Sequence, residues 1–459
     1  MTERLVVIGG DAAGMSAASQ ARRRRTPTVL EIVAFERGRF TSYSACGIPY
    51  FVGDVVPEVD TLIVRSPEEH RRRGIDVRLR TEVSAIDLDT RTLAVHDLES
   101  GTEYHEPFDQ LVIATGAEPV RPALPGADVA GIHGVQVLDD GVAIRTEIDE
   151  TKPRRGVVVG GGYIGLEMAE AMLSRGMDVT LVEGESHPMS TLDPDIASLV
   201  TEALIERGIK VMTDEKVTGF EDRHGNVAAV VTENSVIAAD IVLLGLGVQP
   251  NVTLAESAGI TIGPSGGIAV NRRMQTEHEG VWAAGDCAEK FHRIARAPVS
   301  IALGTHANKE GRVAGINIGG GYATFPGVVG TAVTKVCDLE IARTGLNETE
   351  ATAAGTEWLT ATVDSTTRAG YFPGAEPIKV KVVVEKRSGR LLGAQIVGRE
   401  DAAKRIDVLS AALWNEMLVH EIQHLDLAYA PPFAPVWDPV LIAARKAADE
   451  VEETLAECR

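Results

Sequence analysis

The 459-residue sequence lacks several features that would place it in particular classes of protein. No uninterrupted apolar run approaches the roughly 20 residues that a helix needs to cross a bilayer. Its one basic run, residues 22–25, follows the first apolar segment, whereas a secretory signal carries its positive charge before that segment. A formal net charge of -21 opposes binding to a phosphate backbone. We therefore expect a cytoplasmic globular protein with no membrane or nucleic-acid partner.

Cysteine is also scarce. The four cysteines are Cys46, Cys287, Cys337 and Cys458, and no two of them have C-x-x-C spacing. This pattern predicts neither a metal site nor a redox pair of neighbouring thiols. Each cysteine is then either a small buried residue or a lone reactive thiol.

What the sequence does contain is one supersecondary pattern used twice. Residues 4–38 read as a buried strand, a glycine turn, an alanine-rich helix and a second strand, and residues 154–185 repeat that order. After about residue 325, strands with period-two alternation and helices follow without a glycine fingerprint. The prediction is an α/β protein with two Rossmann-like dinucleotide-binding domains and a C-terminal α+β domain.

The first glycine turn has Gly9 and Gly14 at the first and third positions of G-x-G-x-x-G, and Glu36 ends the next strand. Such a turn lets backbone N–H groups approach a pyrophosphate, and the acidic residue accepts hydrogen bonds from a ribose. Asp11 occupies the middle position, so we expect its side chain to point away from the phosphates. Taken alone, this turn is also compatible with tight helix packing and no ligand.

The second glycine turn is complete, with Gly160, Gly162 and Gly165 directly after a valine-rich strand and Glu183 at the end of the next strand. An acidic residue at that strand end favours a free ribose 2′-hydroxyl and repels a 2′-phosphate. The sequence therefore predicts NADH as the ligand of this unit, with NADPH as the alternative.

A third signal is the stretch from Thr276 to Asp286, "TEHEGVWAAGD". Together with the two units it resembles the FAD- and NAD(P)H-dependent pyridine nucleotide-disulfide oxidoreductases. The resemblance implies that Gly285 and Asp286 contact the flavin cofactor, and that the "ATG" stretch with Thr115 and Gly116 belongs to the same site. It also implies a homodimer. The expected domains are FAD-binding (1–113 and 245–325), NAD(P)H-binding (114–244) and dimerisation (326–459).

The cysteine segment narrows the resemblance to the single-cysteine branch of that family. Ser42, Cys46 and the following "GIPY" match its S-x-x-x-C-G-x-P-Y pattern, whereas Thr41 stands where two-cysteine members have their first cysteine. The resemblance implies that Cys46 holds half of a mixed disulfide. Attack by sulfur requires a thiolate, so we expect the flavin and a nearby helix terminus to lower the pKa of Cys46. His420 and His424 lack the spacing of the acid/base pair of two-cysteine members, and we interpret both as structural.

Within this branch, the sequence most resembles coenzyme A-disulfide reductase. The oxidases and peroxidases of the branch carry a histidine where this chain has Ala12. The "SQ-x-R-R" pattern on the first helix implies that Gln20 and Arg23 contact the coenzyme A nucleotide, and the cysteine motif implies that Ser42 contacts the substrate. A cationic helix face suits a phosphorylated nucleotide.

Two tyrosines extend the resemblance. Tyr371 in "GYFPGA" and Tyr429 in "YAPPF" resemble tyrosines that reach across the dimer and donate a proton to the leaving sulfur. The alternative is that both only pack at the interface. Ala45 differs from typical coenzyme A-disulfide reductases, which have an asparagine directly before the cysteine. This difference leaves open which disulfide is the substrate.

The predicted function is transfer of two electrons from NADH, through FAD and Cys46, to a small-molecule disulfide, with coenzyme A disulfide as the first choice. The alternative within enzymes is an NADH oxidase or peroxidase in which Cys46 cycles through a sulfenic acid. A different class is a flavoprotein that donates electrons to a protein partner. The sequence does not decide the acceptor, a strict preference for NADH, or whether coenzyme A stays bound to Cys46.

Overall fold

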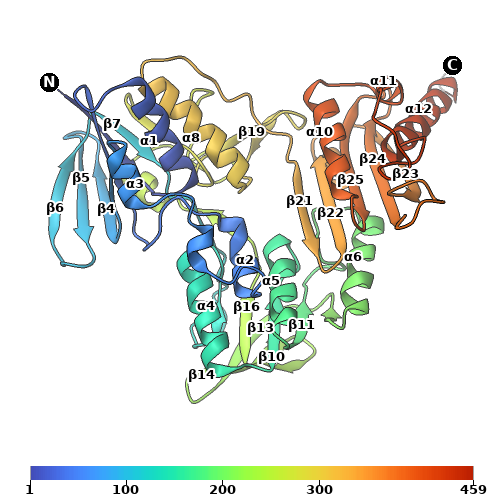
Figure 1. The fold of residues 1–459 in the computed structure, drawn as a ribbon, viewed down its shortest axis with the longest axis horizontal. Coiled ribbons are helices and arrows are strands. Elements are labelled where there is room, and N and C mark those ends of the chain that lie inside the picture. The colour runs from blue at the N-terminus through green and yellow to red at the C-terminus, as the bar shows by residue number, and fades with distance from the viewer. Residues whose placement is uncertain (1, 458–459) are drawn as a thin grey trace.

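The computed structural model describes residues 2–457, which form three units. In Figure 1 the unit with the N-terminal strands lies on one side, the C-terminal unit lies on the other, and a middle unit lies below and between them. The chain passes from the first unit into the middle unit and then returns to the first unit before the C-terminal unit begins.

The first unit is built on a parallel sheet with the strand order β18-β7-β1-β2-β3. Its central strand contains Leu5, Val6 and Val7, all fully buried, as expected for a parallel strand covered on both faces. Helices α1 and α8 lie side by side on this sheet (Figure 1). The sheet strands and helices are β1 (Glu3–Ile8), α1 (Ala12–Arg24), β2 (Leu30–Phe35), α3 (Pro67–Arg72), β3 (Asp76–Arg78), β7 (Gln110–Ile113), α7 (Thr253–Ser257), β18 (Val281–Ala283) and α8 (Gly304–Ile318).

Two antiparallel additions complete this unit. One is the three-stranded sheet of β4 (Thr81–Asp87), β5 (Thr92–Asp97) and β6 (Glu103–Pro107); the other is the hairpin of β19 (Lys290–His292) and β20 (Ala297–Val299).

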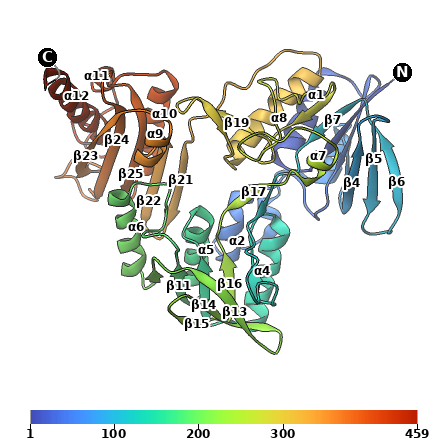
Figure 2. The same ribbon diagram turned by 180° about the vertical axis from the view of Figure 1, so that it is seen from behind.

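The middle unit repeats the parallel design with the strand order β12-β11-β10-β16-β9. A small antiparallel sheet, β13-β14-β15, lies at the lower part of this unit (Figure 2). The elements are β9 (Ile132–His133), α4 (Leu138–Thr151), β10 (Arg155–Val159), α5 (Tyr163–Ser174), β11 (Asp178–Val182), α6 (Pro194–Glu206), β12 (Lys210–Met212), β13 (Val217–Arg223), β14 (Asn226–Thr232), β15 (Val236–Ala238) and β16 (Ile241–Leu244). The two crossing segments, β8 (Ala117–Pro119) and β17 (Val248–Pro250), pair with each other.

The cysteine segment belongs to the middle unit by its packing, although it belongs to the first unit by its place in the chain. It comprises the short helices η1 (Ala45–Gly47), α2 (Ile48–Val52) and η2 (Val59–Leu62). Ile48, Phe51 and Val52 are buried in one hydrophobic core with residues of α4 and α5. The division into residue ranges stays a proposal, and this shared core shows why a boundary in sequence does not separate the two units cleanly.

The C-terminal unit is an antiparallel sheet with the order β21-β22-β25-β24-β23, covered by helices. Strand β21 contacts α5 of the middle unit, so this order places β23 at the far edge (Figure 1). The elements are β21 (Ala332–Val336), β22 (Leu339–Gly345), α9 (Glu348–Ala353), β23 (Trp358–Thr366), β24 (Pro377–Glu385), β25 (Leu391–Gly398), η3 (Ala403–Arg405), α10 (Ile406–Trp414), α11 (Val419–Ile422) and α12 (Pro439–Glu457). An α/β protein with two Rossmann-like units and an α+β C-terminal unit is thereby confirmed.

Candidate active site

The first glycine turn joins β1 to α1 in a conformation that only glycine tolerates. Gly9 has φ +104°, and a Cβ atom there would lie 2.1 Å from the carbonyl oxygen of Ala114. A Cβ atom at Gly14 would lie 2.0 Å from the carbonyl oxygen of Gly9. Close packing of strand, turn and helix therefore requires both glycines, and it brings the first N–H groups of α1 to the carboxyl end of the sheet.

Glu36 is held by the first turn. Its carboxylate accepts hydrogen bonds from the backbone N–H of Gly10 and of Gly38, both at 2.7 Å. Burial raises the pKa of this carboxyl group above its ordinary value. The two bonds leave lone pairs on both oxygens, so Glu36 can still accept hydrogen bonds from a ribose.

The second turn repeats this construction. Glu183 accepts hydrogen bonds from the N–H of Gly161 at 2.7 Å and of Glu185 at 3.0 Å. Gly160 has φ +96°, and a Cβ atom at Gly165 would lie 2.0 Å from its carbonyl oxygen. At Gly162 the nearest atom to an added Cβ is 3.9 Å away, so packing within the protein does not require that glycine. Its absence of a side chain instead leaves room for a pyrophosphate to approach the backbone.

Asp286 lies beneath the first turn in a charged network that sequence reasoning missed. The N–H of the neighbouring Gly285 donates to Glu310 at 2.8 Å, and the Lys290 ammonium donates to the Gly285 carbonyl at 2.8 Å. Lys290 and Glu310 have fully buried side chains and approach to 3.6 Å. Burial raises the pKa of Glu310 to about 7, and Lys290 opposes that rise. Only the i, i+4 spacing of Asp286 and Lys290 hinted at this network in the sequence.

The residues at this point fit a flavin nucleotide. The Oδ1 atom of Asp286 is buried and has no hydrogen-bond partner among the described residues, which leaves an acceptor for an external donor. Small side chains gather between the turn and Gly285: Ala12, Ala13, Ala114, Ala284 and Ala307. A bulky cofactor that carries hydroxyl groups requires space and hydrogen-bond acceptors. The glycine turn and the small alanine side chains leave the space, and the free carboxylate oxygen of Asp286 is an acceptor.

Thr115 and Gly116 hold in place the segment by which the chain passes from the first unit to the middle unit. The Thr115 hydroxyl donates to the carbonyl oxygen of Asn251 at 2.6 Å, and the N–H of Asn251 donates to the carbonyl oxygen of Gly116 at 3.0 Å. Gly116 has φ +70°, a conformation that favours glycine. These residues therefore hold the carboxyl end of β7 to the returning strand β17, beside the first turn.

The cysteine segment is tied to the first turn through the residues before Cys46. The buried Thr41 hydroxyl and the Ser42 N–H, the latter at 3.2 Å, both donate to the carbonyl oxygen of Gly10. The Asp11 carboxylate accepts a hydrogen bond from the N–H of Tyr43 at 3.2 Å, so it turns toward this segment. Burial raises the pKa of Asp11 to about 7, and the neighbouring Glu36 raises it further.

Cys46 is a free, exposed cysteine in η1, directly before α2. The expectation that the flavin and a helix terminus lower its pKa stays a prediction, and the neighbouring protein groups act in the opposite direction. Partial withdrawal from water raises the pKa of the thiol, and the carboxylate of Glu167 on α5 raises it further. Because α2 has only five residues, its N-terminus does not reverse this effect.

Ser42 has a partner that the sequence did not reveal. Its hydroxyl lies 2.9 Å from Nε2 of His70 on α3, and His70 has no exposed surface. Burial lowers the pKa of His70 to about 4, with help from Arg65 and Arg73, so the ring is neutral near pH 7. The Nδ1 atom is buried without a partner among residues 2–457. An unpaired acceptor costs less than an unpaired donor, so we assign the proton to Nε2, which frees the Ser42 O–H to donate elsewhere.

Gln20 and Arg23 lie on an edge of α1 that runs along α8. Ser16, one turn before Gln20, donates to Asn308 of α8 at 2.9 Å and marks this edge. The Arg23 side chain is exposed and forms no ion pair or hydrogen bond with any residue in 2–457, whereas the Arg22 side chain donates to three backbone carbonyl groups. Gln20 accepts a hydrogen bond from Arg24 at 2.9 Å. Within the arginine run, Arg23 is thus the residue available to an external anion.

The two tyrosines lie close to each other and far from Cys46 of the same chain. Tyr371 lies in the connection between β23, the edge strand opposite to β21, and β24, and Tyr429 lies between α11 and α12. Both are exposed, to 78% and 47%, and the Tyr371 phenol interacts with Tyr429. Partial desolvation and this neighbour raise the pKa of Tyr429, which keeps its phenol protonated near neutral pH.

Two further features are absent from the part of the chain that the structure describes. Within residues 2–457, no helix combines the length and apolar character that crossing a membrane demands. In the same range, no three His, Cys, Asp or Glu side chains gather in a way that would hold a metal ion.

Matches to known proteins cover nearly the whole chain. Residues 3–311 match the model described as pyridine nucleotide-disulphide oxidoreductase, and residues 331–439 match the dimerisation domain of the same description. The NAD(P)H sulfur oxidoreductase (CoA-dependent) of Pyrococcus abyssi is 42% identical over 443 residues, covering 96% of this chain and 97% of the relative. The NADH oxidase of Methanocaldococcus jannaschii is 37% identical over 450 residues, covering 97% and 98%.

Solved structures give the same result. The reduced CoADR-RHD of Bacillus anthracis superimposes with a TM-score of 0.95 at 34% identity, covering 99% of this chain and 81% of that one. The NAD-dependent persulfide reductase of A. fulgidus superimposes with a TM-score of 0.94 at 39% identity, covering 98% and 84%.

Proposed function

Because the chain belongs to the pyridine nucleotide-disulphide oxidoreductase family, whose members use FAD and NAD(P)H, we propose that it reduces a coenzyme A disulfide through Cys46. We include persulfides in the substrate class, because the A. fulgidus relative is named a persulfide reductase and the P. abyssi relative a CoA-dependent sulfur oxidoreductase. The observation that carries the proposal is the lone, exposed Cys46 on a segment bonded to the first glycine turn.

The proposed reaction needs one thiol. The Cys46 thiolate attacks one sulfur of the disulfide, the sulfur–sulfur bond breaks, and one coenzyme A leaves and takes up a proton. Cys46 then holds the other half as a mixed disulfide. FAD, when bound at the first turn, supplies the route by which two electrons from NADH reach this bond. Cleavage returns the Cys46 thiolate and releases the second coenzyme A as a thiol, so that one NADH and one proton yield NAD⁺ and two thiols.

Protein groups around Cys46 have separable proposed roles. The neutral His70 keeps the Ser42 hydroxyl as a donor toward the substrate. Arg23, Gln20 and, one turn beyond Asn308, the exposed Arg312 offer a basic edge between α1 and α8 for a phosphorylated nucleotide. Glu167, whose pKa is raised by burial, faces Cys46 from the middle unit and opposes premature ionisation of the thiol.

Tyr371 and Tyr429 enter the proposal through a second copy of the chain. Sheet order keeps them away from their own Cys46, and the dimerisation domain matched at residues 331–439 supports a homodimer. In this dimer the protonated Tyr429 phenol of one copy would donate to the sulfur leaving Cys46 of the other. Tyr429→Phe is then expected to slow disulfide turnover without changing the dimer.

The test is anaerobic oxidation of NADH with coenzyme A disulfide as the only acceptor. Wild type should turn over, Cys46→Ser should lose at least about a thousandfold in kcat because the nucleophile is gone, and Cys337→Ser is the matched control. Turnover that survives Cys46→Ser would instead support an electron donor to a protein partner. No anaerobic turnover, with rapid NADH consumption in air, would support the oxidase or peroxidase alternative that the M. jannaschii relative represents.

A further inference from the structure

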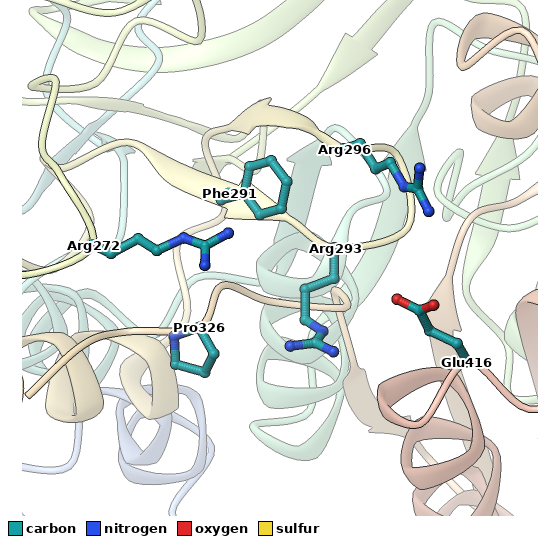
Figure 3. A pocket seen from close by; sticks show the side chains of 6 residues that line it. All are labelled: Arg272, Phe291, Arg293, Arg296, Pro326 and Glu416. Carbon is teal, nitrogen blue, oxygen red and sulfur yellow. The ribbon is translucent and has the colours of Figure 1, made fainter.

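A positively charged pocket lies between the first and C-terminal units, apart from the glycine turns and Cys46. It has a volume of about 240 Å³ and opens between the tip of the β19–β20 hairpin and the end of α10. Its lining residues are Arg272, Phe291, Arg293, Arg296, Pro326 and Glu416. Figure 3 shows the three guanidinium groups around one opening, with the Glu416 carboxylate facing them from the C-terminal unit.

The charges in this pocket are not balanced by the protein. Three arginines face one glutamate, and within residues 2–457 none of these four side chains forms an ion pair within 4.0 Å. The whole chain has 66 acidic and 45 basic residues, so carboxylates are plentiful elsewhere. Like charges held together repel each other unless an anion joins them. The pocket therefore has a net positive charge that no described residue neutralises.

Aromatic rings hold two of the guanidinium groups in place. The Arg293 guanidinium carbon lies 4.3 Å from the centre of the Trp414 ring, and Arg293 donates to the Trp414 carbonyl oxygen at 3.0 Å. The Arg272 guanidinium carbon lies 5.8 Å from the centre of the Phe291 ring. A guanidinium that stacks on a ring leaves N–H donors at its edge free for an oxyanion. Arg293 also joins the hairpin of the first unit to α10 of the C-terminal unit.

We propose that this pocket binds a small polyvalent oxyanion of the phosphate class, free or carried by a metabolite, through Arg272, Arg293 and Arg296. Three guanidinium groups that line one pocket suit a phosphate, which accepts paired hydrogen bonds on several oxygens. A bound anion would bridge two units whose arrangement sets where the C-terminal tyrosines lie. Binding would therefore stabilise the folded dimer, and this stabilisation would grow with the logarithm of ligand concentration once the concentration exceeds the dissociation constant.

The test uses the full-length FAD-bound protein with NAD⁺ present to fill the dinucleotide site. Titration calorimetry with inorganic phosphate and with pyrophosphate, at constant ionic strength, measures binding to wild type and to the double variant Arg272→Gln/Arg296→Gln. Both arginines lack side-chain hydrogen bonds within residues 2–457, so the variant should fold. Arg387→Gln, an exposed arginine on another turn, is the control. We expect the double variant to lose about tenfold or more in affinity and the control to lose none.

The two probes also separate the sources of the anion. A clear preference for pyrophosphate supports a diphosphate-bearing metabolite, and equal binding supports free phosphate. No binding to wild type, or equal binding to wild type and double variant, would overturn the proposal. So would a double variant that sediments as a monomer where wild type is a dimer, because the pocket would then hold a carboxylate of the second copy.

Discussion

The two glycine turns share one construction and differ in what surrounds them. In both, a glycine with positive φ packs against a backbone carbonyl group, and a second glycine lets the helix pack closely against the turn. In both, a glutamate accepts a hydrogen bond from a backbone N–H of the turn at 2.7 Å. Around the first turn lie the cysteine segment, the buried Lys290–Glu310 pair and Asp11 in the middle position. Around the second, a Cβ atom added at Gly162 would meet only the carbonyl oxygen of Gly245, 3.9 Å away.

The difference teaches how one fold is adapted to two kinds of ligand. The first turn is enclosed by contacts from residues far apart in the chain, which suits a group that stays bound. The second turn leaves its middle position open, which suits a nucleotide that enters and leaves in every cycle. Substitutions at matched positions should therefore have different consequences in the two units.

The largest effect is expected at Gly9. In Gly9→Ala the new Cβ would lie about 2.1 Å from the Ala114 carbonyl oxygen, at φ +104°. We expect the unfolding free energy to fall by roughly 3 kcal/mol or more, with loss of bound FAD measured by absorbance. Gly225→Ala is the control, because Gly225 has φ +82° with no atom within 4 Å. Equal destabilisation by both substitutions would mean that φ alone, and not the carbonyl contact, makes Gly9 necessary.

The next effect concerns Glu183 and the choice of nucleotide. In the proposed nucleotide site, Glu183→Ala removes the charge that would repel a 2′-phosphate and the acceptor for the ribose hydroxyl groups. The ratio of kcat/KM for NADH over NADPH should fall about a hundredfold, as measured by steady-state kinetics with each nucleotide. The matched substitution Glu36→Ala in the first unit should leave this ratio unchanged while weakening retention of FAD. An unaltered ratio in Glu183→Ala would refute the assignment of NADH to this turn.

A smaller effect is expected at Gly162. A Cβ atom there meets only a carbonyl oxygen at 3.9 Å, so Gly162→Ala should keep the melting temperature of wild type. It should raise KM for NADH by about tenfold, because the methyl group occupies the approach to the pyrophosphate. Kinetics and thermal unfolding together check both parts. A lower melting temperature with unchanged KM would show that this glycine serves folding instead.

The smallest effect is the pH dependence that Asp11 adds to the first turn. Its pKa is raised from 3.8 to about 7 by burial, so the folded state holds this proton more tightly than the unfolded state does. Stability from this group is present at low pH and is lost as pH rises from about 4 to about 7. Relative to wild type, Asp11→Asn should gain about 2–5 °C in melting temperature between pH 5 and pH 8. The exposed Asp128 provides the control as Asp128→Asn. A pH-independent difference between Asp11→Asn and wild type would contradict this account.

Much of the fold was predictable because its signals are local. Gly9 and Gly160 have positive φ, and at Gly14 and Gly165 a Cβ atom would lie 2.0 Å from the carbonyl oxygen of Gly9 and of Gly160. Both needs are met by glycine alone, so the glycine spacing in the sequence predicted both turns. In the sequence, the buried strands of the two parallel sheets are continuous apolar runs, and strands of the third unit show alternating apolar and polar residues. The count and spacing of the cysteines are sufficient by themselves to exclude a C-x-x-C dithiol pair.

Tertiary structure alone decided the environment of those residues. Glu167 raises the pKa of Cys46, and His70 contacts the Ser42 hydroxyl. Glu310 accepts a hydrogen bond from the N–H of Gly285. The two members of each pair are far apart in the sequence, and no rule of residue spacing predicts that they meet. Sheet order, not sequence, separates Tyr371 and Tyr429 from their own Cys46. Burial and charge act through space, so they depend on which distant segments the fold brings next to a side chain. Residue patterns along the sequence do not reveal those neighbours.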